Sequence, residues 1–78
     1  PSTMISFELP ATDHVELVVY SLDGRRITTL LSDEMVAGTH QVSWNGRNDR
    51  GQQMASGTYF YRLEAGAQVM TRRMVMIK

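Results

Sequence analysis

Hydrophobic and polar residues alternate along most of the chain, which is the pattern of β-strands that bury one face. In the first such segment Ile5, Phe7 and Leu9 fall on one side. Because successive side chains of a strand point to opposite faces, this apolar side is predicted to face the core. The same period predicts six strands, at residues 3–9, 14–20, 25–31, 39–44, 58–65 and 68–78. No segment sustains the period of a helix.

Turn-forming residues separate these segments. Asp23 and Gly24 predict a hairpin turn because such a pair readily adopts positive φ angles. Residues 45–51 are rich in Asn, Asp and Gly and predict a second turn region. Turn signals recur roughly every 8–12 residues, which is the spacing of a sandwich or barrel. The sequence therefore predicts an all-β, immunoglobulin-like (fibronectin III-like) antiparallel sandwich, with residues 1–78 forming a single domain.

Three local predictions complete this interpretation. Leu30 and Leu31 fall on opposite faces, which favours a bulge or a strand end there. Residues 32–38 are predicted to form a loop. The long last segment offers a seventh strand if it splits near residues 71–73, so the sandwich is expected to have about seven strands.

The alternation also predicts the core. Trp44 is the single indole and is expected to fill the space between the sheets, because a buried aromatic side chain removes about 150–250 Å² of surface from water. Further core positions are predicted at Phe7, Leu9, Val15, Val19, Tyr59 and Leu63, and at Ile5, Leu17, Ile27, Val42 and Tyr61.

Composition excludes several classes of protein. The chain has no Cys, which excludes disulfides and thiolate chemistry. Its longest apolar run, residues 74–77, is far shorter than the ~20 residues of a membrane span, so no membrane insertion is expected. Residues 1–9 lack the features of a signal peptide, so secretion would depend on a signal outside this segment. The first residue, Pro1, favours a fragment of a longer polypeptide that continues upstream.

Charge is divided unevenly along the chain. Residues 1–41 hold six acidic and two basic side chains, and residues 42–78 hold six basic and two acidic ones. Strands from the two halves interleave in a sandwich, so opposite charges are expected to pair across neighbouring strands. No basic cluster carries interleaved aromatic residues, so no nucleic-acid partner is expected.

Several motifs follow one another in a particular order. They are Ile5-Ser6-Phe7-Glu8-Leu9-Pro10, Val42-Ser43-Trp44-Asn45-Gly46, Ala55-Ser56-Gly57-Thr58-Tyr59-Phe60-Tyr61 and Arg73-Met74-Val75-Met76-Ile77-Lys78. On these residues the chain resembles the FlgD Ig-like domains and the related C-terminal sorting modules of type IX secreted bacterial proteins. The resemblance implies an accessory module, without enzymatic activity or cofactor, of a larger protein that is secreted or held at the cell surface. Its implied roles are export sorting, surface attachment, a spacer or a component of the flagellar hook cap.

The last strand is the predicted partner-binding element. Residues 74–77 are apolar on both faces, which is typical either of a central strand or of an edge strand awaiting a partner. The resemblance implies that secretion machinery or another protein chain recognises this strand. Arg73 stands where sorting signals often have Lys. The predicted recognition residues are Arg72, Arg73, Met74, Val75, Met76, Ile77 and Lys78.

A candidate calcium site lies in the turn region that follows Trp44. Asn45, Asn48 and Asp49 supply oxygen ligands in a loop that contains glycine, which is a setting that can hold Ca²⁺. Their spacing is not that of an EF-hand, and Asx-turn hydrogen bonds explain the same residues without a metal.

Candidate chemistry elsewhere is sparse. His14 and His40 have no carboxylate or hydroxyl at a spacing that indicates a catalytic triad, so no catalytic residue is predicted. Tyr20, Tyr59 and Phe60 form a candidate platform for a sugar, which keeps a carbohydrate-binding module as an alternative.

Overall fold

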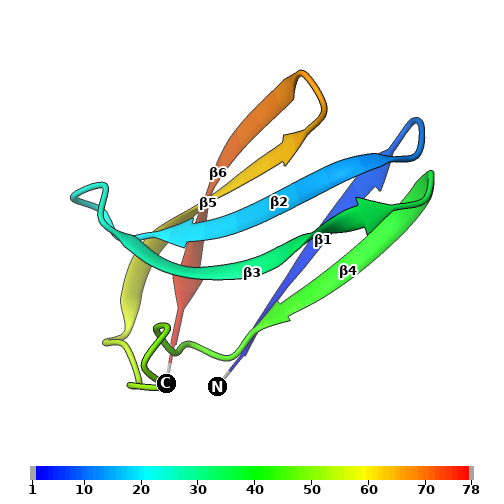
Figure 1. Cartoon of the computed structure of the whole chain (residues 1–78). Coiled ribbons are helices and arrows are strands. Elements are labelled where there is room, and N and C mark those ends of the chain that lie inside the picture. Colours follow the sequence, from blue (N-terminus) through cyan, green and yellow to red (C-terminus); the bar gives the residue numbers. More distant parts are fainter. Residues whose placement is uncertain (1, 78) are drawn as a thin grey trace.

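The computed structural model describes residues 2–77, which form two antiparallel β-sheets (Figure 1). The strands are β1 (Thr3–Leu9), β2 (Asp13–Tyr20), β3 (Arg26–Met35), β4 (Gly38–Trp44), β5 (Gly57–Ala65) and β6 (Gln68–Met76). The smaller sheet pairs β1 with β4, and the larger sheet has the order β3-β2-β5-β6. The predicted all-β, antiparallel, immunoglobulin-like architecture is confirmed. Residues 2–77 contain no helix long and apolar enough to cross a membrane.

The core lies between the two sheets. Its buried side chains are Ile5, Phe7, Leu9, Val15, Leu17, Val19, Ile27, Trp44, Tyr59, Leu63, Met74 and Met76. Trp44 is completely buried, and its ring meets Tyr59 edge-on with ring centroids 5.0 Å apart. The prediction that Trp44 fills the space between the sheets is therefore confirmed. Val42 and Tyr61 are only half-buried and pack against the edge of the core.

Cross-strand partners share a face of the sheet, which gives the larger sheet an inner face toward the core and an outer face away from it. Val19, Tyr61 and Arg72 are partners on the inner face. Tyr20, Phe60 and Arg73 are partners on the outer face. The charged residue Arg72 thus lies on the side of β6 that also carries the buried Met74 and Met76.

The pairing of β2 with β3 contains the predicted bulge. Leu17 pairs with Leu31, but the next residue, Val18, pairs with Thr29. Leu30 therefore has no partner and forms the extra residue of the bulge.

The prediction of a loop at residues 32–38 is wrong. Ser32–Met35 continue β3 and pair with residues 13–16 of β2, so only residues 36–37 connect β3 to β4. Residues 32–34 are all polar, so this part of the strand shows no hydrophobic alternation in the sequence. It can still pair, because pairing at the edge of a sheet depends on the backbone and leaves polar side chains in solvent.

The last strand is not split, so residues 2–77 contain the six strands that the alternation predicts, close to the expected count of about seven. β6 pairs with β5 without interruption from Gln68 to Met76. Residues 71–73 are polar and break the alternation, but their backbone groups continue the ladder opposite residues 60–62.

Candidate functional site

The predicted recognition strand, β6, lies at an edge of the larger sheet. β6 pairs with β5 on one side and with no other strand within residues 2–77. Its last residues alternate sharply in exposure: Met74 and Met76 are buried, whereas Val75 is 59% exposed and Ile77 is 74% exposed. Of the two alternatives that the sequence left open for residues 74–77, the structure therefore shows the edge strand, with one face covered and one face open.

Two arginines of β6 point to opposite faces of the sheet. Arg73 pairs with Phe60 on the outer face, and Arg72 pairs with Tyr61 on the inner face. The Nε of Arg72 donates a hydrogen bond to Sδ of Met70 at 3.3 Å. Neither arginine forms an ion pair with a described residue. Lys78, the last residue of the predicted set, lies outside the described residues.

The proposed aromatic platform exists only in part. Tyr20 and Phe60 are half-buried partners on the outer face, beside a hollow of about 280 Å³ that Leu22 and Arg62 also line. Tyr59 points the other way, into the core, and its hydroxyl donates to the carbonyl of Ala55 at 2.6 Å. The candidate sugar platform therefore loses one of its three rings, because neighbouring residues of a strand face opposite sides.

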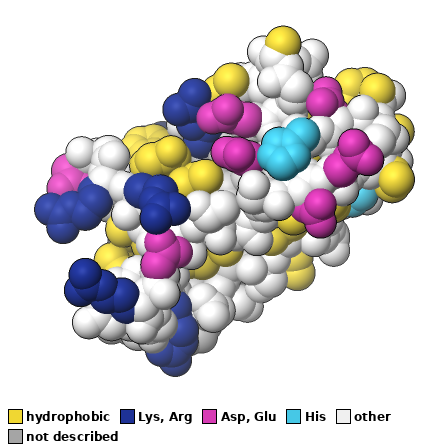
Figure 2. All heavy atoms as spheres, viewed as in Figure 1, with side chains coloured by type: hydrophobic (Ala, Val, Ile, Leu, Met, Phe, Trp, Pro, Cys, Tyr) yellow, Lys and Arg dark blue, Asp and Glu magenta, His cyan; other side chains and the backbone are white. Residues whose placement is uncertain are grey.

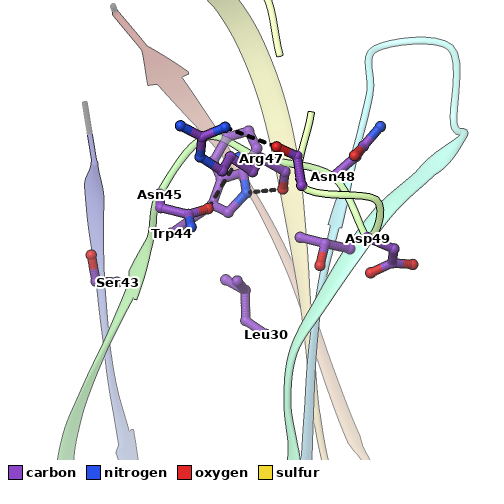
Figure 3. Close-up of a pocket in the computed structure, with 9 residues that line it drawn as sticks. Leu30, Ser43, Trp44, Asn45, Arg47, Asn48 and Asp49 are labelled. Carbon is purple, nitrogen blue, oxygen red and sulfur yellow. Dashed lines mark hydrogen bonds between the residues drawn. The ribbon is translucent and has the colours of Figure 1, made fainter. Parts of the chain in front are cut away.

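The turn region after Trp44 lines a hollow of about 560 Å³, together with Thr28, Leu30 and Ser43 (Figure 3). The indole Nε1 of Trp44 donates to the carbonyl of Arg47 at 3.0 Å. The side-chain oxygen of Asn45 accepts the backbone N–H of Arg47 at 3.1 Å. These bonds fasten the loop to the core residue from which it starts.

The three candidate calcium ligands already have protein partners. Oδ1 of Asn48 accepts the backbone N–H groups of Arg50 at 3.0 Å and Gln52 at 2.9 Å. Oδ2 of Asp49 pairs with the guanidinium of Arg26 at 2.9 Å. The bonds of Asn45 and Asn48 are the Asx-turn bonds that the sequence also allowed, whereas Asp49 is held by an ion pair. Among the described residues, no group of three or more His, Asp or Glu side chains is placed to hold a metal ion.

The two histidines lie on different sheets. His14 belongs to β2 and approaches Oε1 of Glu16 at 3.6 Å. His40 belongs to β4, stacks beside Phe7 and donates a ring N–H to the carbonyl of Val36 at 2.7 Å. These contacts hold local backbone and side chains in place, and they bring no base to a nucleophile.

The charge pattern differs from the expectation of pairing across strands. Figure 2 shows Lys and Arg mainly toward one end of the visible face, and Asp, Glu and His mainly toward the other. Arg62 and Glu64 form an ion pair at 3.4 Å within β5, while Glu16 lies directly opposite Glu64 on the neighbouring strand. The described charges are thus partly segregated along the molecule.

The hydroxyl of Ser21 donates to the carboxylate of Asp23 and lowers the pKa of Asp23 below its ordinary value.

Two packed antiparallel sheets around a buried Trp are typical of immunoglobulin-like β-sandwiches. The sequence model of the FlgD Ig-like domain matches residues 2–68, so the chain belongs to the FlgD Ig-like domain family. Most of β6 lies beyond the matched residues.

A solved structure is similar throughout the fold. The crystal structure of FlgD from P. aeruginosa superimposes with a TM-score of 0.77 and 22% sequence identity, over 96% of this chain. The chain spans 59% of that protein, so the likeness concerns one part of it. No curated protein sequence matches the chain.

Proposed function

We propose that the chain is a non-catalytic accessory module of a larger secreted or surface-attached bacterial protein, and that another protein recognises it through β6 in export sorting or attachment. The observation that carries this proposal is the edge position of β6, with Val75 exposed on the strand and Ile77 exposed directly after its last residue. An unpaired edge supplies backbone donors and acceptors to a partner, and exposed alternate side chains supply specificity.

The rest of the surface supports a role in recognition rather than catalysis. The side-chain oxygens of the 45–51 loop, which lines the hollow of about 560 Å³, already accept donors of the protein, and the histidines are engaged in separate contacts. The FlgD Ig-like domains are a structural family. The proposed module therefore works by presenting a surface, while any chemistry belongs to the polypeptide that carries it.

A reporter fusion tests the sorting role. Residues 1–78 are joined behind a periplasmic reporter with a signal peptide and expressed in a bacterium that has a type IX secretion system. The proposal predicts that the reporter reaches the cell surface or the medium. A reporter that stays in the periplasm, while a known sorting module exports it in the same strain, contradicts the proposal.

The family match favours a second candidate, a structural role in an assembly such as the flagellar hook cap. This role is tested by replacing the corresponding domain of FlgD with residues 1–78 in a flagellated bacterium. Restored motility supports the structural role, and normal export of the fusion without restored motility supports the sorting role.

A further inference from the structure

The larger sheet has two edge strands, and both carry a charge where a core residue would be expected. On β6 the inner face carries Met70, Arg72 and Met74 in succession. On β3 the inner face carries Leu31, Asp33 and Met35, because Leu31 and Asp33 pair with the buried Leu17 and Val15 of β2. Each edge therefore presents an apolar, charged, apolar series, and the two charges have opposite signs.

Neither charge forms an ion pair within residues 2–77. Arg72 has no acidic partner there and donates a hydrogen bond to the sulfur of Met70. Asp33 accepts the neighbouring backbone N–H of Glu34 at 2.8 Å and has no cationic partner within residues 2–77. Charges on the inner face of an edge strand oppose pairing with an apolar strand or with a strand of like charge.

The two edges differ in what lies beside them. Between β6 and β1 lies a groove of about 500 Å³, lined by Phe7, Glu8, Tyr61 and Arg72 among others. Glu8 shares this groove with Arg72 but forms no ion pair with it. At β3 the loop covers one end, where the N–H of Asp49 donates to the carbonyl of Ile27 at 3.2 Å. The half of β3 that contains Asp33 makes no such bond to the loop.

We propose that β6 of one copy of this chain pairs with β3 of a second copy. Strand directions alternate through β3-β2-β5-β6, so a second copy that continues the sheet adds its β3 antiparallel to β6 with the inner faces on the same side. If Arg72 lies opposite Asp33, Met70 meets Met35 and Met74 meets Leu31. The same register places Val69 beside Val36, two apolar side chains that are 54% and 66% exposed in the single chain.

The charges also determine which edges meet. Pairing of β6 with a second β6 brings two Arg72 side chains onto one face, and pairing of two β3 strands does the same with Asp33. Only the pairing of β6 with β3 brings Arg72 opposite Asp33. The two charges therefore disfavour the symmetric pairs and favour the heterologous one. A heterologous contact that does not close produces an open series of copies rather than a single dimer. This inference goes beyond the proposed function, because it concerns contacts between copies of the chain. The two are tested separately, since export is measured on a fusion and self-association on the isolated chain.

Sedimentation velocity tests the inference at concentrations up to about 1 mM, at which even an association of about −4 kcal/mol is half complete. The wild-type chain is expected to show a series of oligomers that grows with concentration. Arg72→Glu and Asp33→Arg are each expected to weaken association at least about tenfold, since like charges then face each other. An equimolar mixture of the two variants is expected to assemble again, because each supplies the edge that complements the other.

Arg50→Glu is the matched control, since it makes the same charge change on an exposed side chain of the 45–51 loop, outside the proposed pairing of residues 69–74 with residues 31–36, and it is expected to associate as the wild type does. Far-UV circular dichroism establishes that all variants are folded. A wild-type chain that stays monomeric at about 1 mM overturns the proposal, as does a mixture of the two variants that stays monomeric when the wild type assembles.

Discussion

Trp44 has the largest fully buried side chain among residues 2–77. Its side chain is completely buried, it packs edge-on against Tyr59, and its N–H donates to the carbonyl of Arg47. The change Trp44→Phe keeps an aromatic ring in the core but removes the N–H and part of the ring. It therefore measures how closely the core fits an indole.

The cost follows from two losses. A phenyl ring buries about 40 Å² less apolar surface than an indole, which is worth about 1 kcal/mol. Loss of the hydrogen bond to the carbonyl of Arg47 costs about 1 kcal/mol more. A domain of this size has a free energy of unfolding of roughly 4–12 kcal/mol, so Trp44→Phe is expected to fold with its stability reduced by about 2 kcal/mol. The corresponding fall in Tm is about 8–16 °C.

Urea and thermal unfolding, followed by far-UV circular dichroism, give both quantities. Val75→Ala is the matched control, because it shortens an exposed apolar side chain and is expected to change the free energy of unfolding by less than about 0.5 kcal/mol. If Trp44→Phe lowers the free energy of unfolding by less than about 0.5 kcal/mol, the assignment of Trp44 as the side chain that fills the space between the sheets is refuted.

Three further predictions concern the turns. Gly46 has a φ of 78°, and a Cβ there would lie 2.6 Å from Nε2 of Gln53, so Gly46→Ala is expected to lower the free energy of unfolding by about 1–3 kcal/mol in urea titrations. Ser21→Ala removes the hydroxyl that donates to Asp23 and is expected to raise the pKa of Asp23 toward its ordinary value, as measured by NMR titration of the carboxyl carbon. Because the folded pKa is the lower one, the stabilisation from Asp23 is present above the unfolded pKa and is lost as the pH falls through the folded pKa. Addition of Ca²⁺ is expected to leave Tm unchanged, since the side-chain oxygens in the 45–51 loop already accept protein donors.

Each of these predictions has its own control. Gly24 also has a positive φ, of 83°, but a Cβ there meets nothing within 4 Å, so Gly24→Ala should cost only the backbone strain of about 1–2 kcal/mol. If it costs more than Gly46→Ala, the contact with Gln53 is not the cause. An unchanged pKa of Asp23 in Ser21→Ala, or a Tm that rises with Ca²⁺, would contradict the corresponding hydrogen-bond assignment.

The parts of the fold that could be predicted are those in which burial alone determines the pattern. β1 and β2 alternate because one face packs on the core, and their buried residues were predicted in full. The second half of β3 could not be predicted, since Ser32, Asp33 and Glu34 reach solvent or the sheet edge and leave no hydrophobic period. Pairing with a distant strand, rather than local composition, decides such a segment.

The candidate site also combines features that the sequence pattern predicts with features that depend on strand order and register. The apolar run at residues 74–77 was visible in the sequence, but its position at an edge depends on the order of strands in the sheet. The opposition of Glu16 and Glu64 and the inner-face position of Arg72 likewise depend on register, which a sequence without homologues does not reveal. An isolated charge within an otherwise apolar alternation was the available signal for both Asp33 and Arg72.

We propose above all that another protein recognises the exposed face at the end of β6. The direct test compares export of the reporter fusion carrying Val75→Glu with export of the fusion carrying Val69→Glu. Both changes place a carboxylate at an exposed valine on the outer face of the same strand, but only Val75 belongs to the predicted recognition residues, 72–78. The account predicts that Val69→Glu is exported as the unaltered fusion is, and that Val75→Glu is retained in the periplasm. Equal export of the two variants would contradict it.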